Sequence, residues 1–286
     1  MRNADGTPAE MRLQLLSDYS RDTDAVATCT ISKTQCAVLV RMEPADRKPL
    51  PTHYPLTFSL VTLDGGTQVA AANVTHRPIA WPALLEDGTS FRIAAAANGS
   101  FAIASCLDTT LRVAILPATG SLITQDIALA PAGGRLSGLT GLRLASLRFN
   151  GPGLSLALTA EQTLPGVGAV SQGVILRLLP TCQPDPAYGE DGLWISPLRP
   201  THRTFRCAGE TTNGIAGHDG NRIVMYGVVP DGGHNPQPAD AADGLLGAFG
   251  IDGIAETDLG GQIRTTSIAS DAGWIYVLAQ RLNPPG

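Results

Sequence analysis

Asp185-Pro-Ala-Tyr-Gly-Glu-Asp-Gly192 and Leu246-Gly-Ala-Phe-Gly-Ile-Asp-Gly253 are two copies of one motif, 61 residues apart. In both copies an aromatic residue precedes a glycine, and an Asp-Gly pair ends the motif. After each copy come two short strands separated by a tight turn, at residues 218–221 and 270–273. A repeat of this length predicts a fold built from similar supersecondary units that pack against one another.

Short apolar runs separated by Gly, Pro, Asn or Asp continue along the whole chain, and no amphipathic helix pattern interrupts them. Many short strands are typical of a sandwich, a barrel or a propeller, and a repeat of about sixty residues favours the propeller. Strands are expected, among others, at residues 25–31, 36–41, 56–63, 91–96, 101–105, 111–116, 122–129, 142–149, 154–159, 174–179, 193–195, 222–228 and 274–282.

The repeated motif resembles the delta-60 repeat, a propeller-forming repeat of bacterial proteins. The first part of the family pattern is matched by Asp185, Tyr188, Gly189 and Gly192, and the second part by Asp219, Gly220, Ile223, Val224 and Gly227. Leu246 departs from the pattern, because the family has aspartate there. The resemblance covers about the last hundred residues and implies a fold, not an activity.

The recurring residues of the motif have structural explanations. Tyr188 and Phe249 are expected to pack as aromatic wedges. Glycine permits a positive φ or a close backbone approach, which we expect at the bend between blades. The glycines concerned are Gly189, Gly192, Gly250 and Gly253.

Fainter copies of the hairpin precede the motif, with turns at residues 32–35, 97–100 and 150–153. Together with the two later turns they predict about five blades. The sequence therefore predicts an all-β fold, a β-propeller of four-stranded antiparallel blades that forms a single domain over residues 1–286. A strand near Met11–Leu16 would close the ring by pairing with the C-terminal blade. The chain could also be a fragment of a larger protein.

The five cysteines contain no C-x-x-C pair, which excludes zinc-ribbon and thioredoxin-like sites. If Ser32 and Lys33 form a hairpin tip, Cys29 and Cys36 lie opposite each other, close enough for a disulfide. The alternative is a pair of half-buried thiols on neighbouring strands.

Charge and hydropathy exclude two classes of partner. A net charge of -5 provides no field that would attract nucleic acid. No apolar run approaches the roughly 20 residues that span a bilayer, so membrane insertion is not expected. The chain as given has no signal peptide, but the polar run after Met1 leaves open that one was removed. We expect a secreted, periplasmic or cell-surface protein.

Long loops are expected on one face of the propeller, opposite the tight turns. They span residues 43–54, 75–89, 130–138, 161–172, 199–211 and 229–242. They contain the candidate ligand-binding residues His53, His76, Trp81, His202, Arg203 and His234. The alternative is that polar residues simply favour exposed loops. His218 is expected to be solvated in a tight turn.

Neither a cofactor nor a catalytic reaction is indicated by a motif of defined spacing. The chain has no H-E-x-x-H pattern and no calcium loop, so no metal is expected and calcium is unsupported. It also lacks a G-x-S-x-G elbow, a P-loop and a dinucleotide fingerprint. We therefore predict a non-catalytic binding or scaffold propeller of a bacterial secreted or surface protein. Its partner would be a protein or a glycan, bound on the rim of long loops.

Two alternatives stay open. The first is a hydrolase or lyase that acts on sugars or lactones at the mouth of the central channel. The second is a structural spacer in a larger assembly, which large apolar patches on the outer strands would indicate.

Overall fold

The computed structural model describes residues 23–32, 35–42, 54–64, 73–85, 90–107, 109–129, 134, 136–210, 214–227, 254–271 and 274–282. All regular structure in these residues is β-strand. No helix with the length and apolarity needed to cross a bilayer is found in the described part of the chain.

Four sheets contain four antiparallel strands each, which follow one another in chain order. The first sheet has β1 (Thr23–Thr30), β2 (Gln35–Met42), β3 (Tyr54–Asp64) and β4 (Asn73–Leu85). The second has β5 (Ser90–Ala95), β6 (Phe101–Leu107), β7 (Thr110–Leu116) and β8 (Ile123–Ala128). The third has β9 (Leu139–Asn150), β10 (Gly153–Leu164), β11 (Gly168–Leu178) and β12 (Leu193–Ile195). The fourth has β13 (Arg206–Glu210), β14 (Gly214–Asp219), β15 (Arg222–Gly227) and β16 (Ile254–Asp258).

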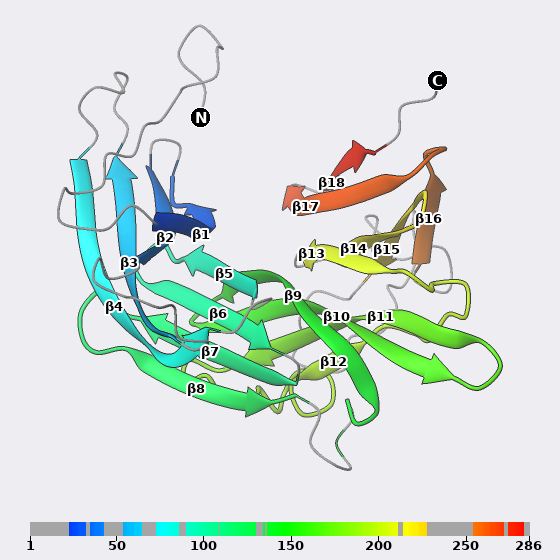
Figure 1. Ribbon diagram of the computed structural model, residues 1–286, viewed down its shortest axis with the longest axis horizontal. Coiled ribbons are helices and arrows are strands. Elements are labelled where there is room, and N and C mark those ends of the chain that lie inside the picture. Colours follow the sequence, from blue (N-terminus) through cyan, green and yellow to red (C-terminus); the bar gives the residue numbers. More distant parts are fainter. Residues whose placement is uncertain are drawn as a thin grey trace, which may run out of the picture.

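A fifth sheet consists of β17 (Ile263–Asp271) and β18 (Trp274–Arg281) in the described residues. The first strand of each sheet lies beside the first strand of the next, in the order β1, β5, β9, β13 and β17 (Figure 1). This arrangement places the first strands around a common axis and the later strands outside, as in the blades of a propeller. The predicted all-β propeller of four-stranded antiparallel blades is therefore confirmed.

The described sheets do not close into a ring, because an opening separates the first sheet from the fifth (Figure 1). The strand near Met11–Leu16 that we expect to close the ring lies outside the described residues.

The described core is formed by apolar clusters between neighbouring sheets. Strand β10 shows how one strand contributes to two of these clusters. Side chains alternate between the two faces of a strand. Leu156 and Leu158 therefore pack toward the second sheet, while Ala157 packs toward the fourth. Because both faces are covered, residues 153–160 are buried without interruption. The sheets are thus held together by side chains that fill the space between blades.

The first copy of the repeated motif forms the connection between β11 and β12. Tyr188 is buried there beneath the guanidinium of Arg177, whose carbon lies 4.2 Å from the ring centroid. Gly189 and Gly192 have φ angles of +58° and +85°. The motif therefore joins the third and fourth strands within one blade, and the predicted position at the bend between blades is wrong.

The second copy of the motif, with Phe249, Gly250 and Gly253, lies outside the described residues. The strand that follows it, β16, begins at Ile254. The strand that follows the first copy, β12, begins at Leu193, 61 residues earlier. The two copies of the motif are therefore separated by the same 61 residues as the fourth strands of two successive blades.

The predicted equivalence of the tight turns is wrong in one case. Residues 97–100 join the first and second strands of their sheet, whereas Gly220 and Asn221 join the second and third strands of theirs. Turn residues specify a tight reversal but not the pair of strands that it joins. The two turns therefore lie at opposite ends of the strands. Tight turns occur on both faces of the propeller, and the predicted separation of tight turns on one face from long loops on the other is wrong.

Cys29 and Cys36 are free thiols, and the register of the first hairpin gives the reason. The hairpin pairs Cys29 with Ala37 and Cys36 with Thr30, one residue away from the predicted register. Directly opposite residues point to the same face, and successive residues to opposite faces. The two sulfur atoms therefore lie on opposite faces, and the predicted disulfide does not form in this register.

Candidate functional site

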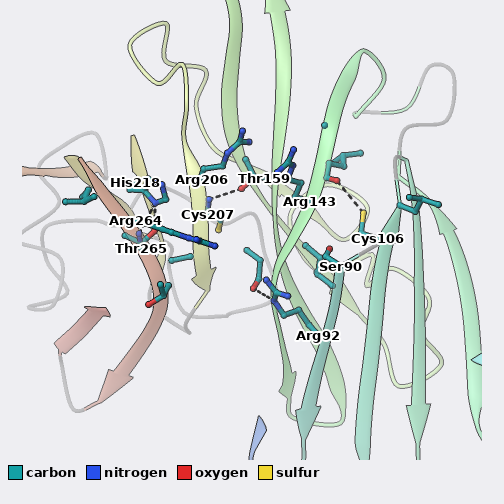
Figure 2. A pocket seen from close by; sticks show the side chains of 18 of the residues that line it. Ser90, Arg92, Cys106, Arg143, Thr159, Arg206, Cys207, His218, Arg264 and Thr265 are labelled. Atoms are coloured by element: carbon teal, nitrogen blue, oxygen red, sulfur yellow. Dashed lines mark hydrogen bonds between the residues drawn. The ribbon is translucent and has the colours of Figure 1, made fainter. Parts of the chain in front are cut away.

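A cavity of about 830 Å³ lies among the inner strands of the second to fifth sheets (Figure 2). Its walls come mainly from β5, β9, β13 and β17, with further residues from β6, β10 and β14. Because these first strands surround the propeller axis, the cavity is an axial pocket. Its size falls in the range of small-molecule sites, which is about 300–1,000 Å³.

Each of the four inner strands contributes one arginine to the lining of the pocket. They are Arg92 on β5, Arg143 on β9, Arg206 on β13 and Arg264 on β17 (Figure 2). No aspartate or glutamate is among the described residues that line the pocket. The lining therefore concentrates positive charge on the axis of a chain whose net charge is -5.

Arg92 is held in place by backbone carbonyl groups. Its Nε donates to the carbonyl oxygen of Ala145 at 2.6 Å, and Nη1 donates to that of Phe91 at 2.7 Å. Burial lowers the pKa of this guanidinium, which nevertheless stays charged because an arginine pKa lies so far above neutrality. Carbonyl dipoles orient the group but do not neutralise it.

The other arginines differ in how far their charge is balanced. Arg206 pairs with Glu161 at 3.1 Å, and the two side chains are 39% and 30% exposed. An ion pair this exposed is worth little, about 0–1 kcal/mol. Arg143 and Arg264 are exposed, and neither forms an ion pair with a described residue. Their guanidinium groups are available to a ligand.

His218 on β14 lines the same pocket and is fixed in one tautomer by Thr265. The backbone N–H of Thr265 donates to Nδ1 at 3.0 Å, and Thr265 Oγ1 lies 2.7 Å from the same nitrogen. A backbone N–H can only donate, so Nδ1 carries no proton and Nε2 carries it in the neutral ring. Burial lowers the pKa of His218, and the charges of Arg206 and Arg264 lower it further. At neutral pH this side chain is a hydrogen-bond donor through Nε2.

The thiol of Cys207 also lines the pocket but is not activated. Burial, with a smaller contribution from the nearby charge of Glu210, raises its pKa to about 12. A thiol, not a thiolate, is therefore present at neutral pH, and the thiolate is the nucleophilic form. The pocket binds through charge and hydrogen bonding more readily than it reacts through sulfur.

The described members of the sequence-predicted site lie in two separate parts of the chain, the first sheet and the connection between the third and fourth sheets. His53 and His234 lie outside the described residues. His76 and Trp81 were placed in a long loop, but the backbone there belongs to β4. His202 and Arg203 lie in the connection between β12 and β13. Neither His202 nor Arg203 lines the axial pocket.

His202 is fully buried, so its predicted exposure on a rim loop is wrong. Its Nε2 lies 2.8 Å from Glu256 Oε1, and its Nδ1 lies 2.7 Å from the hydroxyl of Tyr226. Glu256 also pairs with Arg222 at 2.9 Å. Burial raises the pKa of Tyr226 to about 12, so its hydroxyl stays protonated. The imidazole therefore contacts two strands of the fourth sheet and has no nitrogen left for a ligand, while the backbone carbonyl oxygen of His202 accepts from the N–H of Ser171 in the third sheet at 2.8 Å.

Sequence reasoning missed the four arginines because each lies singly in an ordinary strand, far from the others. The available signal is that the first strands of four successive units, β5, β9, β13 and β17, each contain at least one arginine. That signal is visible only after the strands have been assigned to blades.

No protein-family model matches this chain, and no curated protein matches it. Among solved structures, the chain is similar to the GH43 endo-arabinanase from Bacillus licheniformis, with a TM-score of 0.27 and 11% sequence identity. The similarity covers 91% of this chain and 97% of that chain. A likeness this low carries no argument about the activity of this chain.

Proposed function

We propose that this chain is a ligand-binding propeller that holds an anionic ligand in its axial pocket. The observation that carries the proposal is the set of four arginines, one from each of four successive inner strands, around a single cavity. A guanidinium group presents several N–H donors in a plane and matches carboxylate or phosphate oxygens well. A cleft lined by one sign of charge also concentrates ions of the opposite sign.

The proposal keeps the binding role expected from the sequence and moves the site from the loop rim to the axis. The partner remains a glycan or a protein segment, now one that carries negative charge. The net charge of -5 supports a local site, because the protein as a whole repels anions. A secreted or surface location is part of the same proposal and rests on the sequence alone.

The alternative of glycoside cleavage receives less support from the pocket. Such enzymes commonly use two carboxyl groups about 5–9 Å apart. The described lining residues offer no carboxyl pair, and in this tautomer Nε2 of His218 already holds a proton and cannot accept one. The same residues suit the binding of an anion.

Isothermal titration at low ionic strength with citrate, pyrophosphate and trigalacturonate tests the proposal. At least one of these anions should bind, and added salt should weaken the binding because exposed charges are screened. Arg264→Gln should lower the affinity about tenfold, the usual effect of losing one charge-assisted hydrogen bond. Thermal stability should be retained, because Arg264 is exposed and has no ion pair with a described residue.

The matched control is Arg112→Gln, which removes the same charge from an arginine that pairs with Asp126 between β7 and β8, outside the pocket. The Arg112→Gln variant should bind the anions with the same affinity as the unaltered protein. The proposal is overturned if no anion binds, or if both variants weaken binding equally.

A further inference from the structure

The lining of the axial pocket is rich in hydrogen-bond donors and poor in acceptors. The arginines and the Nε2–H of His218 can only donate. The described lining residues include no Asp, Glu, Asn or Gln, and the other polar side chains are mostly hydroxyls. These hydroxyls belong to Ser90, Thr159, Thr265 and Thr266. A ligand that fits this lining must supply acceptors.

The arginines are distributed around the pocket instead of converging on one point. Figure 2 shows them entering from different strands, with Arg92 apart from Arg143 and Arg206. A single phosphate or carboxylate can contact only the guanidinium groups nearest to it. A ligand with several separated anionic groups can contact all of them.

Two classes of polyanion fit the lining poorly. No Trp, Tyr or Phe is among the described lining residues, so a nucleobase would find no stacking surface. A peptide would bring backbone N–H donors, which need acceptors once they leave water. The described lining provides few of these. A sugar hydroxyl can both donate and accept, and it therefore suits the serine and threonine hydroxyls.

On the basis of the proposed function, we infer that the ligand of the axial pocket is a short acidic oligosaccharide. Its uronate carboxylates would contact the four arginines, and its hydroxyls would contact the serine and threonine hydroxyls between them. A volume of about 830 Å³ is sufficient for a ligand of the size of a small drug, and therefore for a short oligomer but not a long chain segment.

Titration with chemically matched probes tests this inference. Trigalacturonate should bind, and its fully methyl-esterified form should bind at least about tenfold more weakly, because it keeps the length and ring hydroxyls but has lost the charges. Triglutamate, which carries carboxylates on a peptide backbone, and inorganic pyrophosphate should also bind at least about tenfold more weakly than trigalacturonate.

Substitutions in the protein should reproduce the effect of esterification. Arg143→Gln and Arg264→Gln should each lower the affinity for trigalacturonate about tenfold and leave binding of the ester unchanged. The variant Arg112→Gln should bind both probes as the unaltered protein does. Circular dichroism and thermal unfolding of each variant establish that the fold is retained.

The outcomes separate the inference from the proposed function. If pyrophosphate or triglutamate binds as tightly as trigalacturonate in an arginine-dependent way, the function stands and the sugar class is wrong. Equal binding of trigalacturonate and its ester also overturns the inference. If no anionic probe binds, or if Arg112→Gln weakens binding as much as Arg143→Gln, both fail.

Discussion

His202 and His218 lie in neighbouring segments of the chain but in opposite environments. His202 is fully buried, both nitrogens of its ring contact side chains of the fourth sheet, and its backbone carbonyl oxygen binds the third sheet. The ring of His218 lines the axial pocket, and only its Nδ1 forms a hydrogen bond with a described residue. The space between blades is filled by packed side chains, whereas space remains at the axis. Polar groups available to a ligand are therefore found at the axis.

Two glycines, one packed between blades and one in the turn after the pocket strand β14, differ in the same way in the space around them. Gly189 belongs to the motif that packs between the sheets, and Gly220 belongs to the turn that follows His218 and Asp219. Their φ angles are nearly equal, at +58° and +61°. A Cβ added at Gly189 would lie 2.1 Å from the carbonyl oxygen of Leu193, whereas one at Gly220 would meet nothing within 4 Å. An alanine at either position would have the same backbone strain, but only an alanine at position 189 would also clash with neighbouring atoms.

The largest expected effect is that of Gly189→Ala. It should lower the free energy of unfolding by about 3 kcal/mol or more, because a left-handed backbone and a clash with main-chain atoms both oppose the new methyl group. Gly220→Ala should cost about 1–2 kcal/mol, the backbone term alone. Urea denaturation measures both values, and equal losses would show that the region around Gly189 is not rigidly packed.

A second test compares His202 with its exposed neighbour. His202→Ala should lower the free energy of unfolding by about 2–3 kcal/mol, because it removes the two hydrogen bonds that a fully buried imidazole forms with Tyr226 and Glu256. Arg203→Ala should change it by less than about 0.5 kcal/mol, as is usual for an exposed side chain. Trigalacturonate affinity should be unchanged in both variants. Loss of affinity in His202→Ala at retained stability would instead place a ligand site between the sheets.

The smallest expected effect concerns the pH dependence of stability at His218. Its pKa in the folded protein lies below the ordinary value of 6.5 because of burial and the nearby arginines. The unfolded chain therefore binds a proton more readily, and stability should fall as pH drops from 6.5 toward the lowered pKa. Urea denaturation across about pH 8 to pH 5 should show a shallower decrease for His218→Asn than for the unaltered protein. Identical pH profiles would mean that the folded protein does not lower the pKa of this imidazole.

Parts of the fold could be predicted because they depend on neighbouring residues. The turn residues and short apolar runs indicated strands, and the 61-residue period of the motif is also the spacing of β12 and β16. The pairing of Cys29 with Ala37 could not be predicted. One extra residue in the turn shifts the register of the whole hairpin, and the sequence of the turn does not show how many residues it contains. The burial of His202 was missed for a similar reason, since a polar residue in a connection can also close a gap between sheets.

The amino-acid sequence by itself determined the strand pattern and the repeat, since side-chain alternation and turn chemistry act over a few residues. Only the tertiary structure decided which residues meet at the axis. Arg92, Arg143, Arg206 and Arg264 are far apart in the chain, and each lies in a strand whose local pattern does not distinguish an axial face from an interblade face. Their proximity arises because the first strands of successive blades pack side by side, a contact between elements that no local interaction encodes.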